Sequence, residues 1–138
     1  MIIAKKIRLF PNKEQETKMI ESCNTARYIY NYTLAKQEQN HKDGNLFIKN
    51  TEIRKELTQL KKTEKFSWLN NVSNNVTKQA VKDACNAYTK YFKGLSEKPK
   101  FKKKGKSKES FYNDDYKLKI KDESLLLEKV GWIKIKPN

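Results

Sequence analysis

Residues that hold metal ions or build phosphate-binding loops are scarce in this sequence, which has one histidine, two cysteines and four glycines in 138 residues. His41, Cys23 and Cys85 lie far apart and match neither a zinc-ligand spacing nor a Cys–His nucleophile pair. The loop G-x-x-x-x-G-K-[ST] is absent, so nothing supports nucleotide hydrolysis. We expect no metal and no cofactor. Both cysteines fall among apolar helical positions and are interpreted as buried free thiols, with a disulfide or a reactive thiol as alternatives.

Long apolar runs are absent as well. No stretch approaches the roughly 20 residues of a membrane-spanning helix, and the basic N-terminus lacks the apolar segment of a secretory signal. The sequence therefore predicts a soluble, cytoplasmic protein with no membrane partner. Its 2 Trp, 7 Tyr and 6 Phe residues favour a modest core, although 34% of the residues are charged.

Positive charge is what the sequence has in excess. Lys and Arg number 31 against 16 Asp and Glu, which gives a formal net charge of +15, and 28 of the basic residues are lysines. The lysine ammonium binds phosphate as a point charge, whereas the planar arginine fork reads guanine edges. The composition thus predicts binding to a nucleic-acid backbone, with an affinity that falls steeply as salt is added.

Hydrophobic periodicity predicts one strand, three helices and then several strands. Ile7 and Leu9 share one side of a strand over residues 1–10, and Asn12 with Gln15 forms a capping box at the start of a long helix. Ser73 is the expected N-cap of the third helix, and Gly94 is its expected stop. The first two helices are expected over residues 13–39 and 51–62, and the later strands over residues 116–120, 124–127 and 131–136.

This order of elements predicts an α+β fold. The first strand would pair with the late strands in a small split antiparallel barrel, which makes about three helices an insert. The expected domains are residues 1–11 and 98–138 for the barrel and residues 12–97 for the helices. Phe66, Trp68 and Leu69 form an aromatic cluster in the connection before the third helix, and Trp68 and Leu69 are interpreted as core packing.

A lysine-rich run from Lys98 to Lys108 separates the helices from the late strands and cannot fold alone. One interpretation is a solvated, flexible loop. We favour a loop that contacts phosphates, because Phe101, Phe111 and Tyr112 lie within or just after it and aromatic residues among lysines suit unpaired bases. An anionic membrane fits less well, since no basic amphipathic helix accompanies the run.

Two groups of helical residues are further candidates for binding nucleic acid. Arg27, Tyr28 and Asn31 combine a fork donor, a ring and an amide, and an asparagine in mid-helix suggests a specific hydrogen-bond partner. Near the start of the third helix, Gln79 can read a base edge while Lys78 and Lys82 contact phosphate. In the alternative interpretation of the first group, Ile29 and Tyr30 are core residues and Arg27 is an ordinary surface cation. For the second group the alternative is an ordinary polar helix face.

Several short motifs occur in an order that is typical of one family. They are Arg8-Leu9-Phe10-Pro11-Asn12-Lys13-Glu14-Gln15, Ala26-Arg27-Tyr28-Ile29-Tyr30-Asn31, Leu57-Thr58-Gln59-Leu60-Lys61-Lys62, Trp68-Leu69, Ala87-Tyr88-Thr89-Lys90-Tyr91-Phe92, Pro99-Lys100-Phe101-Lys102-Lys103-Lys104, Ser110-Phe111 and Val130-Gly131-Trp132-Ile133-Lys134. With these motifs the chain resembles the N-terminal part of the TnpB (OrfB) transposon-encoded proteins over essentially its whole length.

TnpB proteins are RNA-guided DNA endonucleases related to the ancestors of type V CRISPR effectors. The resemblance implies a wedge domain, which is a small barrel split in sequence, and a helical recognition domain inserted after its first strand. It also implies binding of guide RNA and reading of the short motif that flanks the DNA target. The region was formerly labelled a helix-turn-helix.

The catalytic part of the family does not fall within the residues that match. The family's nuclease has a RuvC-type fold with acidic metal ligands and a small zinc-binding insert, whereas Asp114 and Asp115 are neighbours in a polar segment and make no two-metal site. We therefore expect a non-catalytic module that binds guide-like RNA, DNA or both. The residues expected to bind are Lys6, Arg8, Arg27, Tyr28, Asn31, Lys78, Gln79, Lys82, Lys98, Lys100, Phe101, Lys102, Lys103, Lys104, Ser110 and Phe111.

Two other functions stay open at this point. A free copy of a wedge and recognition region would act as an inhibitor of a type V or TnpB-like effector, in the manner of an anti-CRISPR protein, and its partner would be that effector. A helix-turn-helix regulator would instead dimerise and bind a palindromic duplex.

Overall fold

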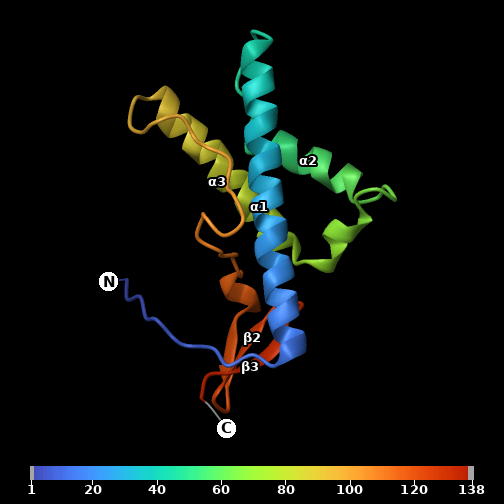
Figure 1. Ribbon diagram of the computed structural model, residues 1–138, viewed down its shortest axis with the longest axis vertical. Coiled ribbons are helices and arrows are strands. Elements are labelled where there is room, and N and C mark those ends of the chain that lie inside the picture. Colours follow the sequence, from blue (N-terminus) through green and yellow to red (C-terminus); the bar gives the residue numbers. More distant parts are fainter. Residues whose placement is uncertain (1, 137–138) are drawn as a thin grey trace.

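The computed structural model describes residues 2–136 and shows an α+β arrangement, as the sequence predicts (Figure 1). The elements in chain order are α1 (Lys13–Lys42), α2 (Asn50–Leu60), the 3-10 turn η1 (Ser67–Asn71), α3 (Asn74–Phe92), the 3-10 turn η2 (Asp115–Lys117), β1 (Lys119–Lys121), β2 (Ser124–Leu127) and β3 (Gly131–Lys134). Helix α1 runs along the long axis of the molecule, α2 and α3 lie on either side of it, and the sheet lies at its N-terminal end. The expected domain limits at residues 1 and 138 lie outside the described residues.

Local sequence signals set the helix ends. The Asn12 side chain accepts a hydrogen bond from the Gln15 amide while the Gln15 side chain accepts one from the Asn12 amide, so the predicted capping box is confirmed. At the other end α1 runs three residues further than predicted and stops at Asp43, before Gly44 with φ of +76°. Ser73 caps α3 as predicted, and Gly94 with φ of +74° follows its last turn.

The main core lies between the three helices. Ile29 of α1, Ile53 of α2 and Val81 of α3 are fully buried in one cluster, which Leu69 of η1 joins. Helix α1 also buries Gln37, whose side-chain amide exchanges two hydrogen bonds with the backbone of Ile48 and so loses no polar partner on burial. The three helices therefore hold one another by apolar contact and tie down the loop after α1.

Two predictions about side chains in this core need correction. Trp68 was expected in the core, but it is 37% exposed and its ring meets the Tyr28 ring edge-on, with 5.2 Å between centroids. The 3-10 turn at η1 explains the difference, because it turns neighbouring Leu69 inward and Trp68 outward. Cys23 was also expected to be buried but is only half-buried, whereas Cys85 is buried as predicted; both are free thiols.

The sheet is a three-stranded antiparallel meander in the order β1-β2-β3. A two-residue turn joins β1 to β2, and both of its residues, Asp122 and Glu123, have positive φ, which is the geometry that matches the twist of a tight hairpin. Leu127, Val130 and Ile133 form the core beneath the sheet, and Leu9 and Met19 pack against them. The β2 limits agree with the prediction, whereas β1 is short because residues 115–117 form η2.

The predicted strand over residues 1–10 is wrong for residues 2–9. Only Phe10 pairs with the sheet, through its amide and the Lys134 carbonyl at 2.8 Å. Ile2 and Ile3 are exposed, and continued antiparallel pairing from Phe10 would place Arg8 opposite Lys136, two like charges. Among the described residues the sheet is open, so no closed barrel is seen. No helix within residues 2–136 combines the length and the apolar character needed to cross a bilayer.

Candidate nucleic-acid interface

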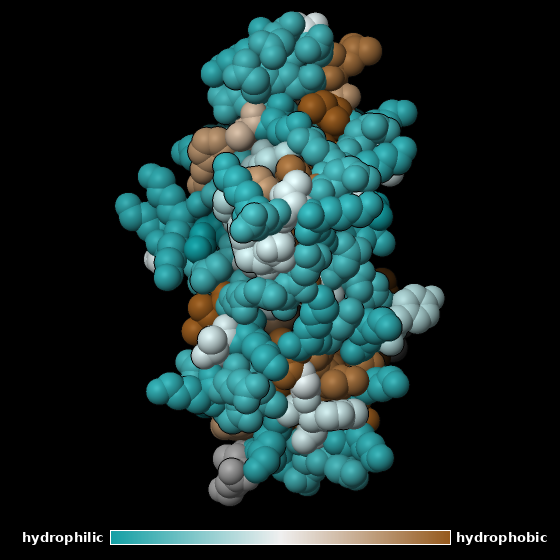
Figure 2. Space-filling view, turned by 90° about the vertical axis from the view of Figure 1, so that its right-hand side faces the viewer, coloured by the Kyte–Doolittle hydropathy of each residue, from teal (hydrophilic) through white to brown (hydrophobic). Residues whose placement is uncertain are grey.

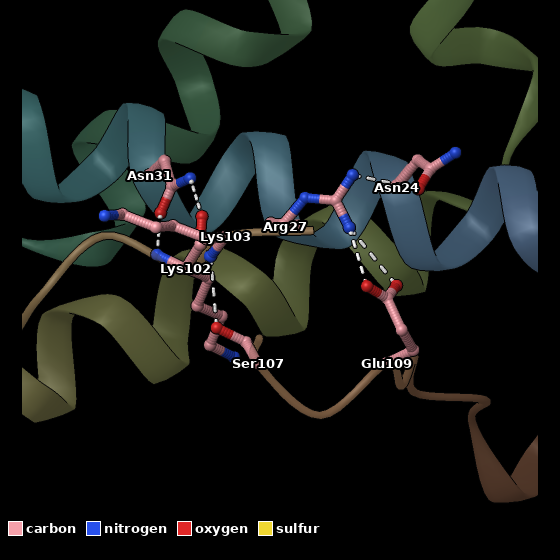
Figure 3. A network of polar contacts seen from close by, with 7 residues as sticks. All are labelled: Asn24, Arg27, Asn31, Lys102, Lys103, Ser107 and Glu109. Atoms are coloured by element: carbon pink, nitrogen blue, oxygen red, sulfur yellow. Dashed lines mark hydrogen bonds and ion pairs between the residues drawn. The ribbon is translucent and has the colours of Figure 1, made fainter. Parts of the chain in front are cut away.

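The lysine-rich run is an ordered segment laid across α1 and α3, and we call residues 98–112 the strap. Asn31 of α1 holds it by a reciprocal pair of hydrogen bonds: its side-chain amide donates to the Lys102 carbonyl at 2.9 Å, and the Lys102 amide donates to its oxygen at 2.8 Å (Figure 3). The asparagine thus pairs with the strap as a neighbouring strand would. This is the specific partner that the sequence suggests for Asn31, and it belongs to the protein's own backbone.

Arg27 holds the far end of the strap. Its guanidinium contacts both oxygens of the Glu109 carboxylate, at 3.0 and 3.2 Å, and donates to the Asn24 side chain at 2.9 Å. The Arg27 side chain is 18% exposed and the Glu109 side chain 43%, so solvent screens this ion pair from the Glu109 side. Figure 3 shows Arg27 and Asn31 side by side along α1, both directed at the strap.

Two further contacts fix the first half of the strap. The Lys98 ammonium lies 3.2 Å from the Glu38 carboxylate, and their hydrogen bond raises the pKa of Lys98 and lowers that of Glu38. The Lys102 ammonium lies over the Tyr30 ring, 4.2 Å from its centroid, in a cation–π contact. Lys98 and Lys102 are therefore occupied within the protein, and they are weaker candidates for phosphate contact than their neighbours.

The remaining strap lysines face solvent. A turn centred on Gly105, with φ of +79°, brings the Ser107 hydroxyl to the Lys103 amide and spreads the lysine side chains around it. In the part of the chain that the structure describes, none of these lysines forms an ion pair. They are Lys100, Lys103, Lys104, Lys106 and Lys108. Five unneutralised ammonium groups on and beside an anchored turn present a concentrated positive potential to a polyanion.

A cleft of about 290 Å³ lies between the strap and the two helices. Gln79 lines it, together with Arg27 and Ser110, but the Gln79 amide already donates to Asp83 at 2.9 Å. Burial raises the pKa of the Cys23 thiol in the same cleft, and the Glu109 charge adds to the shift. The Phe111 side chain, near the end of the strap, packs against the sheet core.

Lys78 lies elsewhere. It lines a separate hollow of about 280 Å³ between α2 and α3, with Arg54 and Lys61. Partial burial lowers the pKa of Lys61, as does the nearby Lys129 charge. The hydrogen bonds of the Lys61 ammonium within residues 2–136 go to neutral side chains, those of Asn74 and Thr77. Sequence reasoning missed Arg54 and Lys61, because nothing in the local pattern shows that α2 and the residue after it lie beside Lys78 of α3.

The remaining predicted residues do not join the strap. Lys82 is half-buried on α3, Tyr28 is exposed beside Trp68, and Lys6 and Arg8 lie on the extended N-terminal segment, where the Arg8 guanidinium covers the Phe10 ring at 5.3 Å. The face on the α2 side is mainly hydrophilic, with apolar areas in separate places (Figure 2). Asp114 accepts a hydrogen bond from the Tyr116 amide, and residues 2–136 contain no group of three potential metal ligands.

Comparison with known proteins finds matches of the same type that the sequence motifs resemble. Residues 1–45 match the family model of the OrfB/IS605 type that is described as a helix-turn-helix domain. The chain is 30% identical over 129 residues to InsQ of Escherichia coli (strain K12), which is named a putative RNA-guided DNA endonuclease, and 27% identical over 105 residues to a Streptomyces pristinaespiralis protein with the same description. These matches cover 94% and 76% of the chain but only 32% and 26% of the relatives.

The matched segment is described as a helix-turn-helix domain, but its structure contains one helix and not two. Within residues 2–45 the chain is extended up to Pro11 and then forms the single, uninterrupted helix α1 of 30 residues. The match nevertheless indicates nucleic-acid binding, and the resemblance of the whole chain to the N-terminal region of TnpB-type proteins is confirmed.

Proposed function

Because the chain corresponds to the N-terminal region of TnpB (OrfB) proteins, we propose that it is a non-catalytic nucleic-acid-binding module whose strap lysines hold the phosphates of RNA. The observation that carries this proposal is the anchoring of the strap: Asn31 holds its backbone at Lys102 and Arg27 holds the Glu109 carboxylate, while the five other strap lysines form no ion pair within residues 2–136. Anchoring lowers the entropy lost when the lysines bind a strand.

The domain assignment is part of the same proposal. Residues 1–11 with 98–138 would correspond to a wedge domain, and residues 12–97 to a recognition domain. The hollow with Arg54, Lys61 and Lys78 then offers a second cationic surface on the helical part, suited to the DNA that flanks a target. The names of both relatives combine an RNA guide with a DNA substrate, which motivates one surface for each.

A charge-removal experiment tests the RNA part. Each phosphate contact to a single strand contributes a slope of about −0.7 in log K against log salt. Replacing Lys103, Lys104 and Lys106 by Ala removes about two units of slope, so the variant loses about 20-fold less affinity than the parent between about 50 and about 200 mM salt. These lysines are exposed, and the melting temperature is expected to stay unchanged.

The control has the same charge change at another place. Lys49, Lys62 and Lys65 are equally exposed but lie around α2, away from the strap. Their replacement is expected to leave the salt slope for RNA near that of the parent. Equal slopes for both triple variants would refute a specific role of the strap.

The two alternative functions give different results. A helix-turn-helix regulator is disfavoured, since residues 13–42 form one continuous helix, and it requires a dimer on a palindromic duplex. An inhibitor of a TnpB-like effector predicts that the chain stays bound to such an effector after ribonuclease treatment. Loss of the effector on RNA digestion supports plain RNA binding instead.

A further inference from the structure

The strap forms one wall of a groove that has no role in the phosphate contacts proposed above. The groove holds about 530 Å³ and lies between α1, α3 and residues 98–107. Its floor is apolar, since Leu34 of α1 and Tyr88 of α3 are almost completely buried there. Its outer wall is the strap itself, with Pro99 and Phe101.

Phe101 is the unexplained residue of this groove. Its side chain is 51% exposed, and within the described residues its ring meets no other aromatic ring. Phe111, ten positions later, packs into the sheet core, so an apolar ring on the strap can be buried where the fold uses it. Leaving a phenylalanine half in water forgoes part of its hydrophobic free energy of burial. A ligand with a flat, apolar face would recover it.

The charges around Phe101 indicate what else the ligand carries. Lys100, Lys103 and Lys106 line the groove and form no ion pair among residues 2–136. The carboxylate in the lining belongs to Glu38, and Lys98 already contacts it at 3.2 Å. The groove is therefore cationic at its rim and apolar at its floor. A planar ring joined to a phosphate has this combination of properties, which is the chemistry of a nucleotide.

Base pairing decides which nucleotides can enter. In a duplex both faces of each base are covered by its neighbours, so only an unpaired base can place its face on a protein ring. We propose that this groove is a stacking site for one unpaired nucleotide, with Phe101 against the base and Lys100, Lys103 and Lys106 around its phosphate. The inference rests on the proposed function and narrows it to single-stranded segments.

The test compares Phe101→Leu with Phe101→Tyr in the full chain. Leucine keeps an apolar side chain but removes the ring, and tyrosine restores the ring. With a fluorescent single-stranded RNA, the leucine variant is expected to bind about tenfold more weakly, while the tyrosine variant binds as the parent does. Binding of a blunt RNA duplex is expected to be the same for all three. Because Phe101 is exposed, both variants should fold, and circular dichroism checks this.

Two controls sharpen the result. Tyr116→Leu removes an aromatic ring that is 87% exposed and lies outside the groove, and it should leave single-strand binding unchanged. A DNA strand of the same sequence shows whether the groove accepts either sugar. An abasic RNA strand has no base to stack, so the parent and Phe101→Leu should bind it with equal affinity.

Failure of the inference differs from failure of the proposed function. If Phe101→Leu binds single strands as tightly as the parent, or weakens the duplex equally, the stacking site is refuted while phosphate binding by the strap stands. If the parent chain binds neither single strand nor duplex at low salt, the proposed function is refuted, and the stacking site with it.

Discussion

Replacing Asn31 by alanine is expected to release the strap from α1 without unfolding the helices. The substitution removes two hydrogen bonds that join Asn31 to the backbone of Lys102, at 2.9 and 2.8 Å. A protein hydrogen bond contributes about 1 kcal/mol net, so the pair contributes about 2 kcal/mol to holding the strap in place. Since about 1.4 kcal/mol is a factor of ten, the population of the detached strap rises about 30-fold.

Amide hydrogen exchange measures this opening directly. The Lys102 amide donates to Asn31 and is expected to exchange about 30-fold faster in the alanine variant. The Val81 amide serves as the internal reference, because Val81 lies in the middle of α3 and is fully buried in the helical core, so its amide should keep its rate. An unchanged rate at Lys102 would refute the clamp. A similar increase at both amides would show that Asn31 supports the whole fold instead of the strap.

Asn31→Asp refines the measurement. The carboxylate still accepts from the Lys102 amide, but it now faces the Lys102 carbonyl without a hydrogen to donate. The Lys102 amide is therefore expected to exchange faster in Asn31→Asp than in the parent. Retention of the parent rate would mean that the donated bond contributes nothing. Both variants are also expected to bind RNA more weakly, because the lysines lose their fixed spacing.

Three further predictions concern stability. Ile29→Ala is expected to destabilise the fold by about 2 to 5 kcal/mol in chemical denaturation, because Ile29 is fully buried between the helices; a loss below about 1 kcal/mol would contradict this core. Trp68→Ala is expected to lower the free energy of unfolding by only about 1 to 2 kcal/mol, since the ring is 37% exposed and makes an edge contact with Tyr28. A loss as large as that of Ile29→Ala would show that Trp68 contributes as a core residue does. Partial burial alone would raise the pKa of Glu56, but hydrogen bonds from Lys36 and Tyr32 outweigh it and the pKa is lowered. The ionised Glu56 thus stabilises the fold above the ordinary glutamate pKa, and this stabilisation is lost as pH falls through the lowered pKa of the folded protein. Glu56→Gln should therefore be less stable than the parent at neutral pH and equal to it in strong acid. A difference in the free energy of unfolding that is the same at all pH values would refute this.

Local signals in the sequence predict most of the helical part correctly. The capping box at Asn12, the N-cap at Ser73 and the glycines after α1 and α3 act within a few residues, so their effect can be predicted without the fold. The β2 strand follows in the same way from its apolar run between turns. The α+β class is a consequence of these elements and their order.

Long-range contacts could not be predicted in this way. Asn31 is 71 positions from Lys102, and Arg27 is 82 positions from Glu109. The sequence indicates that Asn31 has a partner and that the strap is basic, but not that the first holds the second. Arg27 was expected to face nucleic acid, and the structure pairs it with a carboxylate.

The first strand shows the opposite limit. Alternation at Ile7 and Leu9 predicts a strand, yet a strand also needs a neighbouring strand with which it can pair. Phe10 pairs with β3, but residues 2–9 stay outside the sheet. Trp68 fails for a related reason, because a 3-10 turn decides which of two adjacent apolar residues points inward. In both cases tertiary context overrides a correct local pattern.

The most direct test of the account locates RNA on the protein. A single-stranded RNA that carries a photoreactive base is crosslinked to the intact chain at low salt, and the modified peptides are identified by mass spectrometry. Adducts on residues 98–112 are predicted, with a smaller yield after Lys103, Lys104 and Lys106 are replaced. Adducts confined to the N-terminal segment or to β1–β3, or none at all, would contradict an RNA-binding strap.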